Sequence, residues 1–122
     1  MTVLIIDDDE SSRIIARLVL ETLGGMEVIE ADSGVSGVEQ ALRYVPDGIL
    51  LDMLMPGMNG AETLELLRRH GTTAGIPVVI LSGMWSTDDQ AMFQRLGAAG
   101  FIRKPIDTVH FAAEIRFLLS VH

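Results

Sequence analysis

Cysteine is absent from the sequence, which excludes disulfides, thiolate catalysis, iron–sulfur clusters and cysteine-ligated zinc sites. The three histidines, His70, His110 and His122, lie too far apart to supply the paired ligands of a helical zinc motif. No apolar run approaches the ~20 residues of a membrane span, and the N-terminus lacks the basic start and long apolar stretch of a signal peptide. We therefore expect a cytoplasmic protein with no membrane partner.

Basic residues are also scarce. Nine lysines and arginines face seventeen aspartates and glutamates, which gives a formal net charge of −8, and Lys104 is the only lysine. Binding to a nucleic-acid backbone requires a basic stripe, so this balance argues against direct nucleic-acid binding. With 122 residues, the chain is long enough for one hydrophobic core but short for two domains. We therefore expect residues 1–122 to form one domain.

Short apolar runs alternate along the chain with segments whose apolar residues recur at helical spacing. The predicted strands are 3–6, 26–29, 48–51, 76–81 and 99–102, and the predicted helices are 10–23, 33–43, 59–70, 86–96 and 107–119. This alternation predicts a doubly wound α/β fold, in which helices cover both faces of a five-stranded parallel sheet. Strands that are apolar at every position are typical of burial on both faces.

Helical spacing also predicts the apolar side of several helices. These residues are Ile14, Ile15, Leu18, Val19 and Leu23 in the first helix, Val35, Val38, Ala41 and Leu42 in the second, Leu64, Leu66 and Leu67 in the third, and Phe111, Ile115, Leu118 and Leu119 in the last. Asp9 and Glu10 fall in the first helical turn, where we interpret them as partners of the helix dipole. We interpret Arg68 and Arg69 as a solvated helix end.

Polar side chains follow four of the five predicted strands. Asp7 and Asp8 follow the first strand, Asp52 the third, Ser82 the fourth and Lys104 the fifth. In an open parallel sheet, ligands bind at the carboxyl ends of the strands, so we expect these side chains at one edge. The sequence thus predicts a site with three carboxylates, a hydroxyl and the only ammonium group of the side chains.

Three converging carboxylates need a compensating positive charge. Two carboxylates about 4 Å apart repel by roughly 4 kcal/mol at an effective dielectric of 20, which raises a pKa or recruits a metal. Oxygen ligands without histidine or cysteine favour Mg²⁺, with Mn²⁺ as the alternative. Because Mg²⁺ combines carboxylates with phosphate, and a carboxylate can accept a phosphoryl group, the pattern indicates phosphoryl chemistry. Lys104 and Ser82 would then donate hydrogen bonds to phosphoryl oxygens.

These motifs, in this order, resemble the bacterial two-component response-regulator receiver domain, with the chemotaxis regulator as its single-domain form. The resemblance covers essentially the whole chain, and its motifs are Asp7-Asp8, the stretch LDMLMPGMNG at 51–60, Ser82-Gly83 and Lys104-Pro105. It implies a flavodoxin-like (βα)5 fold with strand order 2-1-3-4-5.

The resemblance also implies a role for each residue of the acidic site. Asp52 would be the phosphoacceptor, phosphorylated by a sensor histidine kinase, a phosphotransfer protein or a small phosphodonor. Asp7, Asp8 and Asp52 would hold Mg²⁺ together with the backbone carbonyl of Leu54. Lys104 would bind a phosphoryl oxygen. The protein would be a signalling switch that assists its own phosphorylation and dephosphorylation, and not an enzyme.

The remaining implied roles concern switching. Ser82 would follow the phosphoryl group and Phe101 would move with it as the switch aromatic, although a strand phenylalanine is also an ordinary core residue. The peptide bond between Lys104 and Pro105 would be cis, against about 5–6% of X–Pro bonds in folded proteins. The fourth helix, fifth strand and fifth helix would face an output domain, a downstream protein or a second copy of the chain. The sequence leaves open which of these reads the switch, and whether the chain is a stand-alone regulator or part of a longer protein.

Two positions near the site are apolar. Leu54 stands two residues after Asp52, and Met84 two residues after Ser82; in the family, these side chains border the path of the hydrolytic water. Since neither side chain offers this water a hydrogen bond, we expect a comparatively long-lived phosphorylated form.

Two other functions remain open at this point. A haloacid-dehalogenase-like phosphohydrolase would use Asp7 as nucleophile and Asp9 as general acid/base, but this leaves Asp52 unexplained. A receiver-like interaction module that is never phosphorylated would typically have lost an acidic residue or the lysine, and this sequence retains both.

Overall fold

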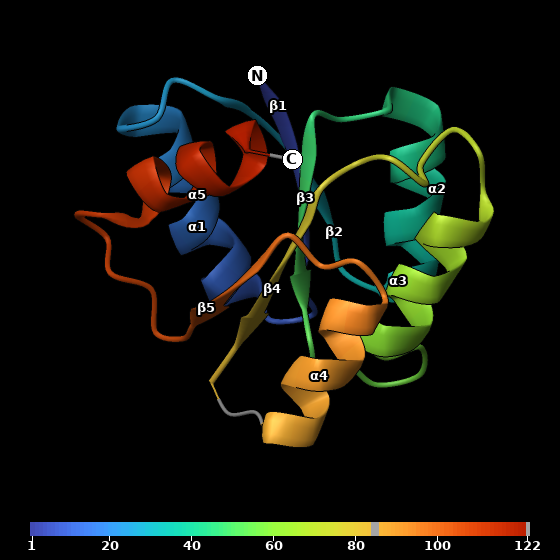
Figure 1. Cartoon of the computed structure of the whole chain (residues 1–122). Helices are drawn as coiled ribbons and strands as arrows, with labels where there is room; N and C mark the ends of the chain where they lie inside the picture. Colours follow the sequence, from blue (N-terminus) through green and yellow to red (C-terminus); the bar gives the residue numbers. More distant parts are fainter. Residues whose placement is uncertain (84–85, 122) are drawn as a thin grey trace.

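Five strands and five helices alternate along the chain in the computed structural model, which describes residues 1–83 and 86–121 (Figure 1). The elements are β1 (Thr2–Ile6), α1 (Glu10–Thr22), β2 (Glu27–Ala31), α2 (Gly34–Tyr44), β3 (Gly48–Asp52), α3 (Gly60–Arg69), β4 (Val78–Ser82), α4 (Thr87–Arg95), β5 (Gly100–Arg103) and α5 (Phe111–Ser120). All strand pairs are parallel and the strand order is β2-β1-β3-β4-β5. The predicted fold class and strand order are therefore confirmed.

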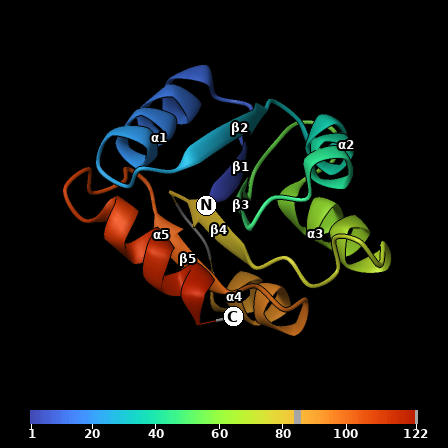
Figure 2. The same cartoon turned by 90° about the horizontal axis from the view of Figure 1, so that it is seen from above.

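The sheet separates two hydrophobic cores. Helices α1 and α5 cover one face, and α2, α3 and α4 cover the other (Figures 1 and 2). Along β1, Val3 and Ile5 belong to the first core, whereas Leu4 and Ile6 belong to the second. Alternate residues of one strand are thus buried on opposite faces, which explains why the strand is apolar throughout.

The apolar side predicted for α1 is wrong except at Val19, which is buried as expected. Ile14, Ile15 and Leu18 of this helix are 51%, 47% and 62% exposed, and Leu23 just after it is also exposed. Ala16 and Leu20 are buried together with Val19, because small and aliphatic side chains on this side allow α1 to lie close to the sheet and α5. The helix therefore presents a second apolar surface to solvent.

Helix α2 departs from prediction in the same way. Val35 and Leu42 are exposed, and two glycines, Gly34 and Gly37, lie on the buried side with Val38 and Ala41 as expected. A Cβ atom added to Gly37 would lie 2.5 Å from Cδ1 of Ile6, so only glycine permits this close approach to β1. The periodicity of apolar residues does not include glycine, so it did not predict that α2 contacts β1 through its backbone at Gly37.

The ends of the elements are mostly as predicted. Asn59 opens α3 and Ser86 opens α4, each in a capping box with an acidic residue three positions later. Helix α5 begins at Phe111 rather than at the predicted residue 107, and residues 108–110 form a turn. Within this helix, Phe111, Ile115 and Leu119 are buried as expected.

Arg68 is not a solvated helix end. Its guanidinium donates hydrogen bonds to four backbone carbonyls, those of Ala74 and Ile76 before β4 and those of Leu96 and Gly97 after α4. Burial lowers the pKa of this guanidinium. Arg69, in contrast, is 71% exposed at its side chain and, among the described residues, makes only a long ion pair with Glu65, as the interpretation of a solvated end requires.

The described helices are all too short or too polar to cross a lipid bilayer.

Candidate functional site

Asp7 lies directly after β1, at the carboxyl edge of the sheet. Its backbone amide continues the β1–β2 ladder by donating to the carbonyl of Ala31, and its side chain is 1% exposed. One carboxylate oxygen accepts from Nζ of Lys104 at 2.6 Å, and the other accepts from the backbone amide of Asp9 at 2.9 Å. A buried carboxylate requires such donors, and Asp7 receives them from the neighbouring turn and from the segment after β5.

Asp7, Asp8 and Asp52 come together as the sequence predicts. Each offers a carboxylate oxygen, and the three oxygens lie within 4.8 Å of one another. Asp7 and Asp52 are buried, whereas Asp8 is exposed at the mouth of the cluster. The donor set consists of oxygen atoms with excess negative charge, so these residues fit a hard divalent cation such as Mg²⁺.

Lys104 provides the positive charge closest to the cluster among the described residues. In addition to its contact with Asp7, its Nζ lies 3.4 Å from Oδ1 of Asp52. Burial alone would lower the pKa of Lys104, but hydrogen bonding to Asp7 and attraction by Asp52 outweigh burial and raise it. The ammonium group therefore stays protonated beside the two buried carboxylates.

Asp52 ends β3 and has an unusual affinity for protons. Burial and, second, repulsion by the charge of Asp7 raise the pKa of Asp52 from its usual value of 3.8 to about 6, although Lys104 opposes the shift. One positive charge thus does not fully compensate the cluster, and the site gains stability from a further cation or from a proton.

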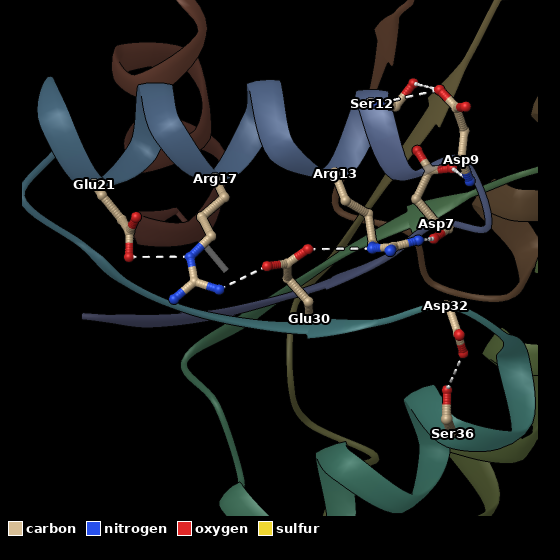
Figure 3. Close-up of polar contacts among 9 residues, drawn as sticks. All are labelled: Asp7, Asp9, Ser12, Arg13, Arg17, Glu21, Glu30, Asp32 and Ser36. Atoms are coloured by element: carbon tan, nitrogen blue, oxygen red, sulfur yellow. Dashed lines mark hydrogen bonds and ion pairs between the residues drawn. The ribbon is translucent and has the colours of Figure 1, made fainter.

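The turn after β1 is held by the start of α1 (Figure 3). The carboxylate of Asp9 accepts hydrogen bonds from the backbone amide and the hydroxyl of Ser12, so Asp9 caps the helix, consistent with its interpretation as a partner of the helix N-terminus. These bonds lower the pKa of Asp9. This carboxylate is therefore engaged in capping, which disfavours the role of general acid/base.

Arg13 is a residue near the site that sequence reasoning missed. Its Nη1 donates to the backbone carbonyl of Asp7 at 2.7 Å, and its Nε lies 3.1 Å from Oε1 of Glu30 on β2 (Figure 3). The only signal in the sequence was a pair of arginines, Arg13 and Arg17, spaced by one helical turn, and this spacing does not reveal the partner on another strand.

The predicted switch residues lie on neighbouring strands. Ser82 is buried at the end of β4, and its carbonyl accepts a hydrogen bond from the backbone amide of Lys104 at 2.9 Å. Phe101 on β5 is partly buried and packs edge-on against Phe93 of α4, with the ring centroids 6.4 Å apart. The peptide bond between Lys104 and Pro105 is cis, as the resemblance implies.

The side chain of Leu54, in the loop after β3, is well exposed. Met84 lies outside the described residues.

A cavity of about 290 Å³ adjoins the acidic cluster. Its polar end is formed by Asp7, Lys104 and Ser12, and the rest of its lining is mainly apolar, with Ile15, Ala16, Leu81, Pro105 and Ile106. Ile15 also belongs to the exposed apolar surface of α1. The acidic site and this surface are therefore continuous.

Residues 3–116, nearly the entire chain, match the response regulator receiver domain. The chain therefore belongs to the family of response-regulator receiver domains, which act as signalling switches. The three acids and the lysine at the carboxyl edge of the sheet are the features from which the sequence predicted this family.

Several relatives place the chain within the family. It is 33% identical over 118 residues to protein PilH of Pseudomonas aeruginosa, and the match covers 97% of each chain. It is 34% identical over 117 residues to RpaA of Synechocystis, a DNA-binding transcriptional regulator, but this match covers 96% of the chain and 48% of RpaA. The chain thus spans about half the length of RpaA and nearly all of PilH.

Solved structures agree with the fold. Chemotaxis protein CheY4 of Vibrio cholerae superimposes with a TM-score of 0.90 at 26% identity, covering 96% of this chain and 97% of CheY4. The receiver domain of a histidine kinase from Syntrophus aciditrophicus has a TM-score of 0.85 at 28% identity, with coverage of 98% and 90%. These comparisons favour the receiver function over a phosphohydrolase or an unphosphorylated interaction module.

Proposed function

We propose that the carboxylate of Asp52 accepts a phosphoryl group from the phosphohistidine of a histidine kinase or a phosphotransfer protein, within a single receiver domain. An oxygen of this carboxylate attacks phosphorus, the P–N bond to the imidazole breaks, and the imidazole leaves with the electron pair. The observation that carries this proposal is the convergence of Asp7, Asp8 and Asp52 beside a single lysine.

The residues around Asp52 support this reaction in different ways. Asp7, Asp8, Asp52 and the backbone carbonyl of Leu54 would hold Mg²⁺ or Mn²⁺, which would supply the positive charge that an anionic phosphoryl group requires. Lys104 is already within reach of Asp52 and donates to a phosphoryl oxygen as a point charge. A phosphoryl group adds about −2 charge and three strong acceptor oxygens, so Lys104 gains a partner when Asp52 is modified.

The switch carries this local change to another face. Ser82, whose backbone carbonyl accepts a hydrogen bond from the amide of Lys104, donates its hydroxyl to the phosphoryl group in the modified state. Phe101 then moves inward and alters its contact with Phe93 of α4. The face made by α4, β5 and α5 is thereby presented differently to an output domain, a downstream protein or a second copy of the chain.

The exposed apolar surface of α1 is the surface on which we expect the phosphodonor protein to dock. Ile14, Ile15 and Leu18 are about half exposed or more, and Val109 before α5 is 73% exposed. Ile15 lines the cavity that also contacts Asp7 and Lys104, so a partner bound there brings its phosphohistidine to the mouth of the site. Apolar surface of this kind is typical of an interaction site.

The test is labelling with a small phosphodonor such as acetyl phosphate, read by intact mass and by hydroxylamine sensitivity, which is diagnostic of an acyl phosphate. We expect one phosphoryl group per chain, dependent on Mg²⁺ and abolished by Asp52→Asn. The matched control is Asp32→Asn, which removes an exposed carboxylate outside the cluster and should leave labelling unchanged. Labelling that persists in Asp52→Asn would refute the site, and phosphate on Asp7 with turnover would support the hydrolase.

A further inference from the structure

Arg13 is bound more tightly into the structure than the neighbouring arginine on the same helix. Its side chain is 16% exposed, whereas that of Arg17 is 43% exposed. Both guanidinium groups pair with Glu30, at 3.1 Å for Nε of Arg13 and 2.6 Å for Nη1 of Arg17 (Figure 3). Only Arg13 also contacts the acidic turn, through its hydrogen bond to the backbone carbonyl of Asp7.

This hydrogen bond restrains the orientation of the peptide unit between Asp7 and Asp8. Because the peptide unit is planar, holding the carbonyl of Asp7 also holds the amide nitrogen of Asp8 and the start of that residue. The carboxylate of Asp7 itself is already held by Lys104 and by the amide of Asp9. Asp8 is exposed, so no surrounding packing fixes its carboxylate, and the orientation of its backbone sets the region that this carboxylate can reach.

Glu30 orients Arg13 for this contact. The planar guanidinium donates from Nε to Glu30 and from Nη1 to the Asp7 carbonyl, and these two bonds define its position in a way that a single ammonium group does not reproduce. Glu30 stands on β2 directly opposite Ile5 of β1, so the ladder that carries Asp7 also carries the residue that anchors Arg13. The hydrogen bond from Arg17 and, to a smaller extent, the one from Arg13 lower the pKa of Glu30 and keep this carboxylate ionised.

We propose that Arg13 is a positioning residue that holds the Asp7–Asp8 peptide so that the carboxylate of Asp8 converges with those of Asp7 and Asp52. This inference rests on the proposed function, because it concerns the affinity of that cluster for Mg²⁺. Residues that orient metal ligands through such outer contacts typically change metal affinity by roughly 10- to 100-fold when they are replaced.

A role of Arg13 through its charge and a role through positioning predict opposite changes in Mg²⁺ affinity when Arg13 is replaced. Arg13 is a cation near three carboxylates, so if it acted only through its charge, Arg13→Gln would strengthen Mg²⁺ binding. If Arg13 positions Asp8, the same substitution weakens binding. We expect Arg13→Gln to raise the Mg²⁺ dissociation constant, measured by titration calorimetry, by roughly tenfold. We expect the Mg²⁺ concentration for half-maximal labelling by acetyl phosphate to rise in parallel, with little change in rate at saturating Mg²⁺.

Arg17→Gln is the matched control, since it removes an equal charge from the same helix and the same glutamate without any contact to Asp7. Its Mg²⁺ affinity should equal or slightly exceed that of the wild type. Arg13→Lys, which keeps the charge and loses the two-pronged geometry, should bind Mg²⁺ more weakly than the wild type and tests the same point if Arg13→Gln does not fold by circular dichroism.

Two results would overturn this inference alone: Mg²⁺ binding by a folded Arg13 variant as tight as in the wild type, or an equal loss of affinity in Arg17→Gln. A wild-type protein that neither binds Mg²⁺ nor becomes labelled would refute the proposed function and this inference together.

Discussion

Neutralising Asp52 should stabilise the metal-free protein. In the folded state, burial and the charge of Asp7 raise the pKa of Asp52 from 3.8 to about 6. The ionised carboxylate is therefore less favourable in the folded than in the unfolded chain. Asp52→Asn keeps the shape of the side chain and removes the charge, while Lys104 keeps its 2.6 Å contact with Asp7.

The expected gain in the free energy of unfolding follows from the pKa shift of Asp52. At about 1.4 kcal/mol per pKa unit, a rise from 3.8 to about 6 corresponds to about 3 kcal/mol. The mouth of the site is open to solvent, which screens part of this cost, so we expect Asp52→Asn to raise the free energy of unfolding by about 2 kcal/mol near pH 7.

The size of this stabilisation depends on pH, whereas its sign does not. Below the unfolded pKa, Asp52 is protonated in both states and contributes nothing. Between about pH 4 and 6, the unfolded chain has released the proton and the folded chain retains it, so the contribution of Asp52 to wild-type stability falls as pH rises. Above this range the cost is constant. The difference in stability between the variant and the wild type should therefore grow across this window and then level off.

Urea unfolding with EDTA, at several pH values on either side of this window, measures the difference directly. Since carboxylates outside the acidic cluster titrate equally in both proteins, subtracting the two curves isolates Asp52 and its interactions within the cluster. Adding Mg²⁺ should stabilise the wild type more than the variant. An Asp52→Asn variant that is no more stable than the wild type near neutral pH, or whose gain is the same at low pH, would contradict the raised pKa of Asp52.

Three further results are expected. Arg68→Met should lower the free energy of unfolding by about 2–4 kcal/mol, because four carbonyls lose their donor, whereas Arg69→Met should change it by less than about 0.5 kcal/mol; equal urea midpoints would contradict the Arg68 contacts. Leu18→Arg should slow transfer from a phosphohistidine protein by about tenfold, equivalent to about 1.4 kcal/mol, without affecting labelling by acetyl phosphate; loss of both activities would argue against a docking role. Leu54→Asn combined with Met84→Glu should speed autodephosphorylation several-fold, since both new side chains can hydrogen-bond water, and unchanged decay of the phosphorylated form would refute that expectation.

The strands and the edge of the sheet could be predicted from the sequence because their signals are local. A run such as Val78–Leu81 is apolar at every position, and this pattern has few explanations besides a strand covered on both faces. Asp7 and Asp52 each follow such a run, and Lys104 follows the shorter and less buried strand β5. Once the strands are parallel, geometry alone places their ends together, and the distances of 2.6 Å and 3.4 Å to the lysine agree with this expectation.

The sequence did not predict which side of α1 is buried, and the tertiary structure was needed to show it. Periodicity shows that α1 has apolar residues in register, but it does not distinguish the stripe that meets the sheet from the stripe that meets solvent. Ala16 and Leu20 are buried and Ile14 and Leu18 are exposed because the packing of α5 decides which stripe is covered.

The same limit applies to two arginines: Arg68, which the sequence pattern wrongly indicated as a solvated helix end, and Arg13, for which the pattern indicated no role. Each looks like a surface cation in a helix, and each in fact donates to backbone carbonyls of segments distant along the chain. Arg68 contacts the segments before β4 and after α4, and Arg13 contacts the end of β1 while paired with Glu30. The hydrophobic pattern and the polar residues at the strand ends were enough to predict the fold class and the residues of the acidic cluster, since both signals are local. The contacts of the two arginines could not be predicted in this way, because a backbone carbonyl leaves no trace in the identity of its residue.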